Sequence, residues 1–192
     1  MPKKSIGAQT ILFPTPVLIV GSYDADDKPN LMAAAWGGIC CSDPPCLAIS
    51  LRKATYTFGN LMARKAFTVN CLSESQAAEA DYYGIMTGRN TDKWAATGVT
   101  PVKSDLVDAP YGLEFPFTVE CQVIHTIEIG LHTQFIGKVM DIKASGEILG
   151  DNDLPDITKL KPFLFDPANR NYYGIGPFLG AAFSIGLAIK KK

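Results

Sequence analysis

A run of small side chains beside a tryptophan is the first feature of this sequence that could form part of a binding site for a reactive ring. Asn30 is followed, after Leu31 and Met32, by Ala33, Ala34, Ala35 and Trp36. Methyl-sized side chains let a flat ring lie against the backbone, whose N–H and C=O groups can then meet the polar edge of the ring. The alternative for the same run is a helical turn or a closely packed strand without a ligand.

Residues that suit a phosphate monoester come later in the chain. Arg52, Thr55 and Thr57 stand between an alternating segment, residues 46–51, and a short predicted helix that runs to Lys65. Hydroxyls, a guanidinium and free N–H groups at a helix start supply what a group of roughly two negative charges requires. The alternative is an ordinary N-cap with solvated basic neighbours.

Several large enzyme classes lack their characteristic residues here. Two histidines and scattered cysteines do not offer the ligand set of a zinc hydrolase. The sequence has no G-x-x-x-x-G-K-[ST] phosphate loop and no G-x-S-x-G motif. A glycine run at 174–180 resembles a dinucleotide fingerprint, but Pro177 interrupts it and no strand-helix-strand unit fits after Gly180. We interpret that run as turn and core packing.

The five cysteines, at positions 40, 41, 46, 71 and 121, show neither C-x-x-C spacing nor the density of a secreted disulfide domain. We therefore expect a reducing, cytoplasmic environment. Cys40, Cys41 and Cys46 are expected to be buried free thiols. Adjacent strand residues point to opposite faces, so Cys40 and Cys41 are not expected to bind one ion together, and no metal site is predicted.

The elements that must position these residues are mostly strands. A short apolar run closed by a turn predicts a strand over 17–22. Alternation of apolar and polar residues predicts strands over 46–51, 67–71 and 117–129, and 132–143 is expected to pair with the last of these. Gly130 joins the last two as an antiparallel hairpin, and Gly137 predicts a bulge or a close backbone approach. Helices are few and no strand-helix-strand alternation appears, which favours a mainly β antiparallel barrel or sandwich.

One helix start can be predicted from its capping residues. Ser73 and Gln76 have the spacing of a capping box, and Leu72 is placed to pack against Ala77. We expect this helix to end at Gly84.

Composition and charge restrict the class of protein further. The chain has 192 residues, 47% of them hydrophobic and 19% charged, which predicts one folded domain over residues 1–192. Eighteen basic residues against 19 acidic ones give a net charge of -1, so nucleic acid is not an expected partner. The segment 176–189 is too short and glycine-rich to span a membrane, and we expect packed core followed by a solvated lysine tail. No signal peptide or membrane association is predicted.

Taken together, these motifs resemble one family, the flavin reductase-like proteins of the FMN-binding split barrel, in particular the flavoredoxin and ferric reductase branch. The resemblance covers most of the chain. It is carried by the order and spacing of several short segments: Pro14 to Val17, residues 30–36, 42–45 and 50–57, Phe67 to Asn70, Arg89 with residues 92–94, and residues 132–139.

The resemblance implies an antiparallel FMN-binding split barrel with a few inserted helices. It also implies three sets of cofactor-binding residues. The ring and ribityl chain of FMN would contact Asn30, Ala33, Ala34, Ala35, Trp36, Ser50 and Leu51. The phosphate would be held by Arg52, Thr55 and Thr57, and Asn70 would close the slot. Lys93 would add charge near the phosphate, with a solvated helix lysine as the alternative.

Further residues acquire roles from the same resemblance. His132 would lie beside the flavin as the catalytic residue, where the nicotinamide of NAD(P)H or another electron donor stacks; the alternative is a hairpin histidine bonded to its neighbours. Tyr172 and Tyr173 would cover the flavin or pack the barrel mouth. The family pairs as a homodimer with each flavin near the interface, and the apolar side chains of residues 117–129 suit such a partner surface.

The function implied is that of an FMN-binding oxidoreductase or electron-transfer flavoprotein. It would pass electrons from NAD(P)H or a redox protein through FMN to an acceptor: a flavin, a ferric complex or a partner protein. Backbone donors at the pyrimidine edge would stabilise the reduced anion. Two alternatives share the barrel: a binding module for flavin or haem without turnover, and an enzyme similar to pyridoxamine-phosphate oxidase.

Overall fold

A computed structural model describes residues 1–191. Its main element is a seven-stranded sheet in which every neighbouring pair is antiparallel, in the order β3-β2-β6-β9-β10-β5-β4. In chain order the strands are β2 (Leu18–Tyr23), β3 (Pro29–Ala34), β4 (Gly37–Ser42), β5 (Pro45–Arg52), β6 (Ala66–Cys71), β9 (Phe117–Ile129) and β10 (His132–Ala144).

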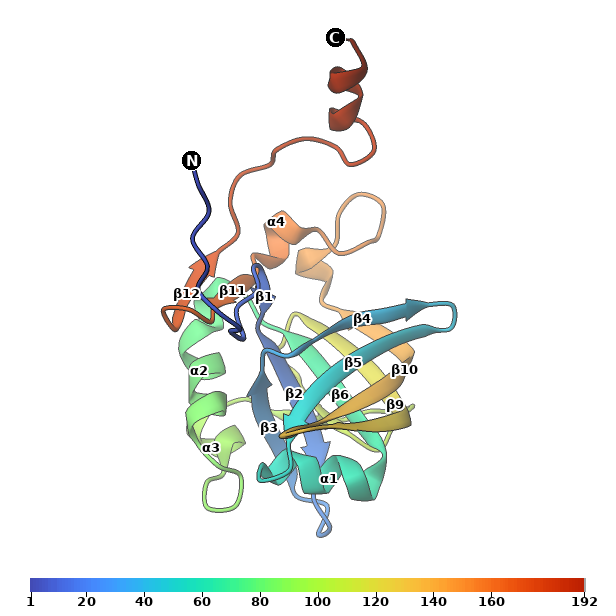
Figure 1. Ribbon diagram of the computed structural model, residues 1–192. Coiled ribbons are helices and arrows are strands. Elements are labelled where there is room, and N and C mark those ends of the chain that lie inside the picture. The colour runs from blue at the N-terminus through green and yellow to red at the C-terminus, as the bar shows by residue number, and fades with distance from the viewer. Residues whose placement is uncertain (192) are drawn as a thin grey trace.

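Helices and short strands cover the edges of this sheet (Figure 1). The α-helices are α1 (Tyr56–Arg64), α2 (Ala77–Ile85), α3 (Lys93–Thr97) and α4 (Ile157–Leu160), and 3₁₀ turns span Glu74–Gln76, Gly146–Ile148 and Ile185–Lys191. A three-stranded sheet contains β1 (Thr15–Pro16), β11 (Phe163–Asp166) and β12 (Asn171–Gly174), and a two-stranded sheet contains β7 (Pro101–Lys103) and β8 (Pro110–Gly112).

The sheet curls into a split barrel because its two outer strands follow one another in the chain. Ala35 and Trp36 connect β3 to β4, and the N–H of Ser50 on β5 donates to the carbonyl of Trp36 at 2.8 Å. The inward side chains form one apolar cluster: Leu18, Val20, Leu47, Ile49, Leu51, Leu61, Phe67, Val69, Val119, Cys121 and Phe135. This fills the barrel, so a ligand of any size must bind outside it.

A second apolar cluster fixes the helices that border the outer face of β3. Tyr83 of α2, Trp94 of α3 and Phe115 pack together with Ile19 of β2 and Leu31 of β3. The Trp94 and Phe115 rings are stacked at a centroid distance of 6.4 Å. As a result, α2 and α3 are held beside β3 (Figure 1).

The predicted hairpin is confirmed. β9 spans Phe117–Ile129, β10 begins at His132, and the register between them shifts between Ile136 and Gly137. A Cβ at Gly137 would lie 2.7 Å from Cζ of Phe67, which is a close approach that only glycine permits.

The predicted helix after the capping box is also confirmed. Oε1 of Gln76 accepts from the N–H of Ser73 at 3.2 Å, and α2 ends at Ile85, one residue beyond the predicted stop.

Two expectations about burial are wrong. The segment 176–189 does not pack in the core: it extends away from the barrel (Figure 1), with Phe178 84% exposed. The side chains of the predicted lysine tail, 190–192, lie outside those that the structure describes. Cys40 and Cys41 are exposed, whereas Cys46 is buried as expected. The reason is that β4 is an outer strand, with a register shift between Ile39 and Cys41.

Candidate functional site

A polar cavity of about 250 Å³ lies between β3, the start of α1 and the loop that joins α2 to α3. The structure brings four of the predicted residues together here: Asn30, Thr55, Thr57 and Lys93. Thr55 is the N-cap of α1, and its hydroxyl accepts from the N–H of Phe58 at 3.3 Å. The N-cap alternative is therefore correct for Thr55, and this cap also lines the cavity.

Asn30 carries an unused hydrogen-bond acceptor in this cavity. Its Nδ2 donates to Oγ1 of Thr57 at 2.9 Å, and the residue is 4% exposed. Among the described residues, Oδ1 of Asn30 has no hydrogen-bond partner. Because buried polar atoms are nearly always bonded, this oxygen indicates a ligand or water donor such as a hydroxyl group.

Lys93 supplies a buried positive charge at the same cavity. Its Nζ donates to the carbonyls of Leu31 at 2.6 Å and Tyr83 at 2.8 Å, and the residue is 3% exposed. An ammonium has three donors, so one proton is left for a ligand. Burial lowers the pKa of Lys93 to about 8. The alternative of a solvated helix lysine is wrong, because Lys93 is buried at the start of α3, which packs against β3.

A larger and more apolar cavity, of about 460 Å³, continues along β3. It is lined by Ala33, Ala34, Ala35 and Trp36, by Gly84 of α2, and by Phe165 and Tyr172 of the small sheet. Gly84 lines both cavities, so the two are adjacent. A flat apolar ring in the larger cavity and a polar tail in the smaller one would match this division.

Tyr172 is a fixed wall of the apolar cavity. Its hydroxyl donates to Oδ1 of Asp81 at 2.9 Å, and burial together with this bond raises the pKa of Tyr172 to about 12. Tyr173 is 55% exposed and lines a different hollow with Phe13. Of the two tyrosines, Tyr172 alone contributes to this cavity.

His132 and Ser50 meet at a third hollow, of about 400 Å³, at the far end of the apolar cavity. Trp36 and Thr10 line both spaces, and the third hollow is also lined by Ile129 and by Gln9, Ile11 and Leu12 of the N-terminal segment. His132 is also the register partner of Arg52 across β5 and β10. Most of the predicted residues therefore line three adjoining hollows, from Lys93 past the alanines to His132.

Three predicted residues lie elsewhere in the part of the chain that the structure describes. Leu51 is buried in the barrel core, and the side chain of Arg52 is exposed at the end of β5, outside the three cavities. Asn70 is fully buried in β6, where its Nδ2 donates to the carbonyl of Ile19 and its Oδ1 accepts from Thr118. These bonds join β6 to β2 and β9.

Sequence reasoning missed Tyr56, Arg89 and Phe165 as cavity residues. Arg89 was noted only as part of a motif. No local pattern identifies them. Tyr56 in the first turn of α1 and Arg89 in the α2–α3 loop line the polar cavity, and Phe165 of β11 lines the apolar one.

The fold and these adjacent cavities define a class: a split-barrel protein with an elongated slot for a ring carrying a polar tail. A family model described as "flavin reductase like domain" matches residues 10–173. The chain belongs to the flavin reductase-like family.

Solved structures and a sequence relative agree with this assignment. The chain is similar to flavoredoxin of Desulfovibrio vulgaris (Miyazaki F), at 53% identity and a TM-score of 0.92, covering 96% of this chain and 100% of that one. It is also similar to flavoredoxin from Methanosarcina acetivorans, at 26% identity and a TM-score of 0.91, covering 98% and 100%. The stachydrine N-demethylase reductase subunit Stc3 of Rhizobium meliloti (strain 1021) is 28% identical over 138 residues. The matched part is 70% of this chain and 56% of that protein.

The site residues fit a flavin. The small alanine side chains leave room for a ring, Oδ1 of Asn30 can accept from a ribityl hydroxyl, and the free proton of Lys93 can reach an anion. A flavin-related redox or electron-transfer role follows from the family. Within residues 1–191, no His, Cys, Asp and Glu residues gather as a metal site, and no helix has the length and apolar character needed to cross a membrane.

Proposed function

We propose that the protein binds FMN along β3 and uses it to transfer electrons from NAD(P)H or a redox protein to an acceptor. The acceptor is a flavin, a ferric complex or a partner protein. The observation that carries this proposal is the pairing of an unbonded Asn30 Oδ1 with a buried Lys93 ammonium in one cavity beside the alanine-lined slot. The pair suits a polyhydroxyl chain that ends in an anion.

When bound, FMN supplies the hydride or single-electron chemistry. The residues of this chain bind and orient it. Thr55, Thr57 and Lys93 hold the phosphate, and Asn30 holds a ribityl hydroxyl. The alanines and Trp36 line the ring, and Tyr172, fixed by Asp81, excludes water from one side. No side-chain nucleophile is required.

Anaerobic reduction tests the proposal most simply. The protein is loaded with FMN, and its absorbance near 450 nm is followed after addition of NADH and, separately, NADPH. Rapid bleaching after addition of either nucleotide supports an oxidoreductase. Persistent colour with both donors, followed by bleaching with a reduced redox protein, indicates an electron carrier. Persistent colour with every donor would indicate a module that binds flavin without turnover. A protein that does not bind FMN would refute the proposal.

His132 is assigned to the donor side of the flavin because it lines the third hollow together with Trp36 and Ser50. His132→Ala is expected to raise KM for NAD(P)H by about tenfold, the effect of losing one polar contact, while leaving the Kd of FMN unchanged. Equal effects on both ligands would contradict this role.

We also propose that the protein is a homodimer. Large apolar side chains are exposed on the β9–β10 hairpin, with Ile127, Ile129 and Leu131 at its turn and Met140 and Ile142 toward its open end. Ile39 is exposed on the outer strand β4, which β5 separates from the hairpin. Neighbouring exposed apolar side chains, such as the three at this turn, indicate association, and two-fold pairing is its commonest form. Sedimentation equilibrium tests this, with Ile129→Glu expected to give monomers.

The five free thiols favour a reducing, cytoplasmic compartment.

A further inference from the structure

The polar cavity is bridged at its outer end by one arginine. Both Nη1 and Nη2 of Arg89, in the loop between α2 and α3, donate to the carbonyl of Ala54 at 3.2 Å. Ala54 lies immediately before Thr55, the N-cap of α1. The Arg89 side chain therefore connects the two segments that flank the cavity.

Tyr56 provides the surface on which Arg89 lies. Cζ of Arg89 is 5.7 Å from the centroid of the Tyr56 ring, within the range of a cation–π contact. Both side chains line the cavity. The guanidinium thus has a preferred position that needs no ligand: it donates two hydrogen bonds to the carbonyl of Ala54, and its Cζ lies over the Tyr56 ring.

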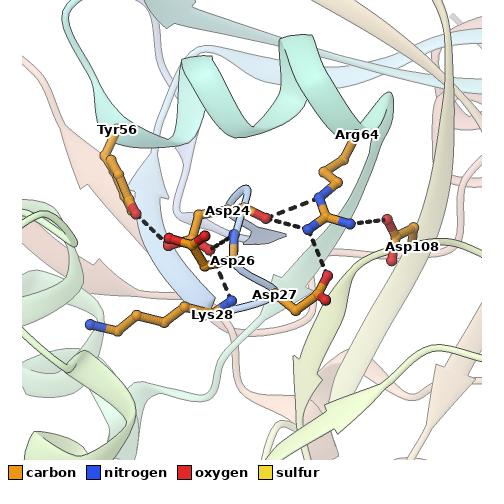
Figure 2. A network of polar contacts seen from close by, with 7 residues as sticks. All are labelled: Asp24, Asp26, Asp27, Lys28, Tyr56, Arg64 and Asp108. Atoms are coloured by element: carbon orange, nitrogen blue, oxygen red, sulfur yellow. Dashed lines mark hydrogen bonds and ion pairs between the residues drawn. The ribbon is translucent and has the colours of Figure 1, made fainter.

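The Tyr56 ring is itself held by a polar network (Figure 2). Its hydroxyl donates to Oδ2 of Asp24 at 2.5 Å, which raises the pKa of Tyr56 to about 12, so the hydroxyl remains a donor at neutral pH. Oδ1 of Asp24 accepts from the N–H groups of Asp26 and Lys28, both at 2.9 Å.

The network continues to Arg64, which stabilises the turn that carries Asp24. Arg64 donates to the main-chain carbonyl of Asp24 and pairs with Asp27 at 2.6 Å and Asp108 at 3.1 Å (Figure 2). Because Arg64 lies in α1, like Tyr56, the turn between β2 and β3 is attached to both ends of that helix. Tyr56 is therefore a rigid platform and not a mobile side chain.

A closed end matters because flavin nucleotides differ beyond the first phosphate. FMN ends in a monoester, so a bound FMN leaves the Arg89–Ala54 bridge in place and presents its charge to the guanidinium. FAD continues into a second phosphate and an adenosine, and with the first phosphate at Thr55, Thr57 and Lys93 these groups would have to leave the cavity past the bridge that Arg89 and Ala54 form in its lining. We propose that Arg89, supported by Tyr56, closes the phosphate end of the cavity and makes the site select flavin mononucleotide over flavin adenine dinucleotide. This rests on the proposed function, whose flavin site it refines.

Binding titrations of FMN, FAD and riboflavin test the proposal, with intrinsic flavin fluorescence as the signal. The native protein is expected to bind FMN more tightly than FAD. In Arg89→Ala, FMN binding should weaken by about tenfold or more, because a charge-assisted contact is lost. FAD binding should be unchanged or tighter. The Kd of FAD divided by the Kd of FMN should therefore fall by at least the same factor. Riboflavin, which has no phosphate, should be unaffected.

Three further variants separate selection from simple loss of charge. Arg89→Lys keeps the charge but not the planar fork, so it is expected to retain FMN better than Arg89→Ala while still losing selectivity. Tyr56→Phe keeps the ring and loses the bond to Asp24, and should lose part of the selectivity. Lys103→Ala removes an exposed charge on β7, outside the cavity, and serves as the control.

The possible results are distinct. A native protein that binds FAD as tightly as FMN, or variants that weaken FMN and FAD by one common factor, would overturn the selection by Arg89 and leave the flavin site intact. A native protein that binds none of the three ligands would overturn the proposed function and this inference with it.

Discussion

Raising the pH through 8 should weaken FMN binding while riboflavin binding stays constant. In the free protein, burial lowers the pKa of Lys93 to about 8. Between about pH 7 and 8 the ammonium is already protonated and the phosphate, with its second pKa of about 6, is fully ionised, so the affinity changes little with pH. Above about pH 8, the free protein must take up a proton to form the charge pair, so Kd rises by about tenfold per pH unit.

The size of the effect follows from the two pKa values of Lys93. If the phosphate restores the ordinary value of 10.5, the interval from about 8 corresponds to about 3.4 kcal/mol, at about 1.36 kcal/mol per pH unit, or about 300-fold in Kd. By pH 9.5 the weakening should already be about 30-fold. This range is wide enough to measure by fluorescence titration.

The assay compares FMN with riboflavin from pH 6 to 9.5, with circular dichroism as a check of folding. Lys93→Met serves as the second comparison, because it removes the titrating group and should give weak, pH-independent FMN binding. A flat FMN profile in the native protein would refute the contact between Lys93 and the phosphate. Parallel profiles for FMN and riboflavin would do the same.

Three other substitutions test the site and the fold. Asn30→Ala should weaken riboflavin and FMN alike by about tenfold to 100-fold in titrations, because the ribityl chain loses its acceptor; a loss confined to FMN would argue against that contact. Phe135→Ala should lower the free energy of unfolding by about 3–5 kcal/mol in urea, since Phe135 is fully buried in the barrel. Gly21→Ala should destabilise the fold clearly in the same assay, because its Cβ would lie 2.1 Å from the carbonyl oxygen of Pro110; native-like stability would contradict the packing described.

Strands with strict alternation were predictable because the barrel imposes one buried face on them. The β9–β10 hairpin is the clearest case: its inward residues fill the barrel, and Gly137 lies where the Phe67 ring approaches the backbone. The helical segment that begins with the 3₁₀ turn Glu74–Gln76 and continues as α2 was predictable from the capping box at Ser73 and Gln76, since that signal is local.

Burial could not be predicted where it depends on what covers a segment. The apolar composition of residues 176–189 predicts a core position, but the chain leads this segment away from the barrel. Cys40 and Cys41 are exposed because β4 is an outer strand, a property of strand order that local sequence does not contain.

The candidate site was partly predictable for the same physical reason. The alanine run, Asn30 and the Thr55–Thr57 segment lie on single elements with recognisable spacing. The burial of Lys93 depends on the packing of a five-residue helix against β3. The contacts of Tyr56 with Arg89 and with Asp24 join three segments that are distant in sequence. Such contacts appear only once the tertiary structure is formed.

A crystal structure of the protein grown with FMN tests the central claim most directly. The account predicts the ring beside Ala33–Ala35 and Trp36, and the phosphate within hydrogen-bond distance of Nζ of Lys93 and Oγ1 of Thr57. A flavin bound in the reverse direction, with its phosphate beside His132, or a flavin bound away from β3, would contradict it.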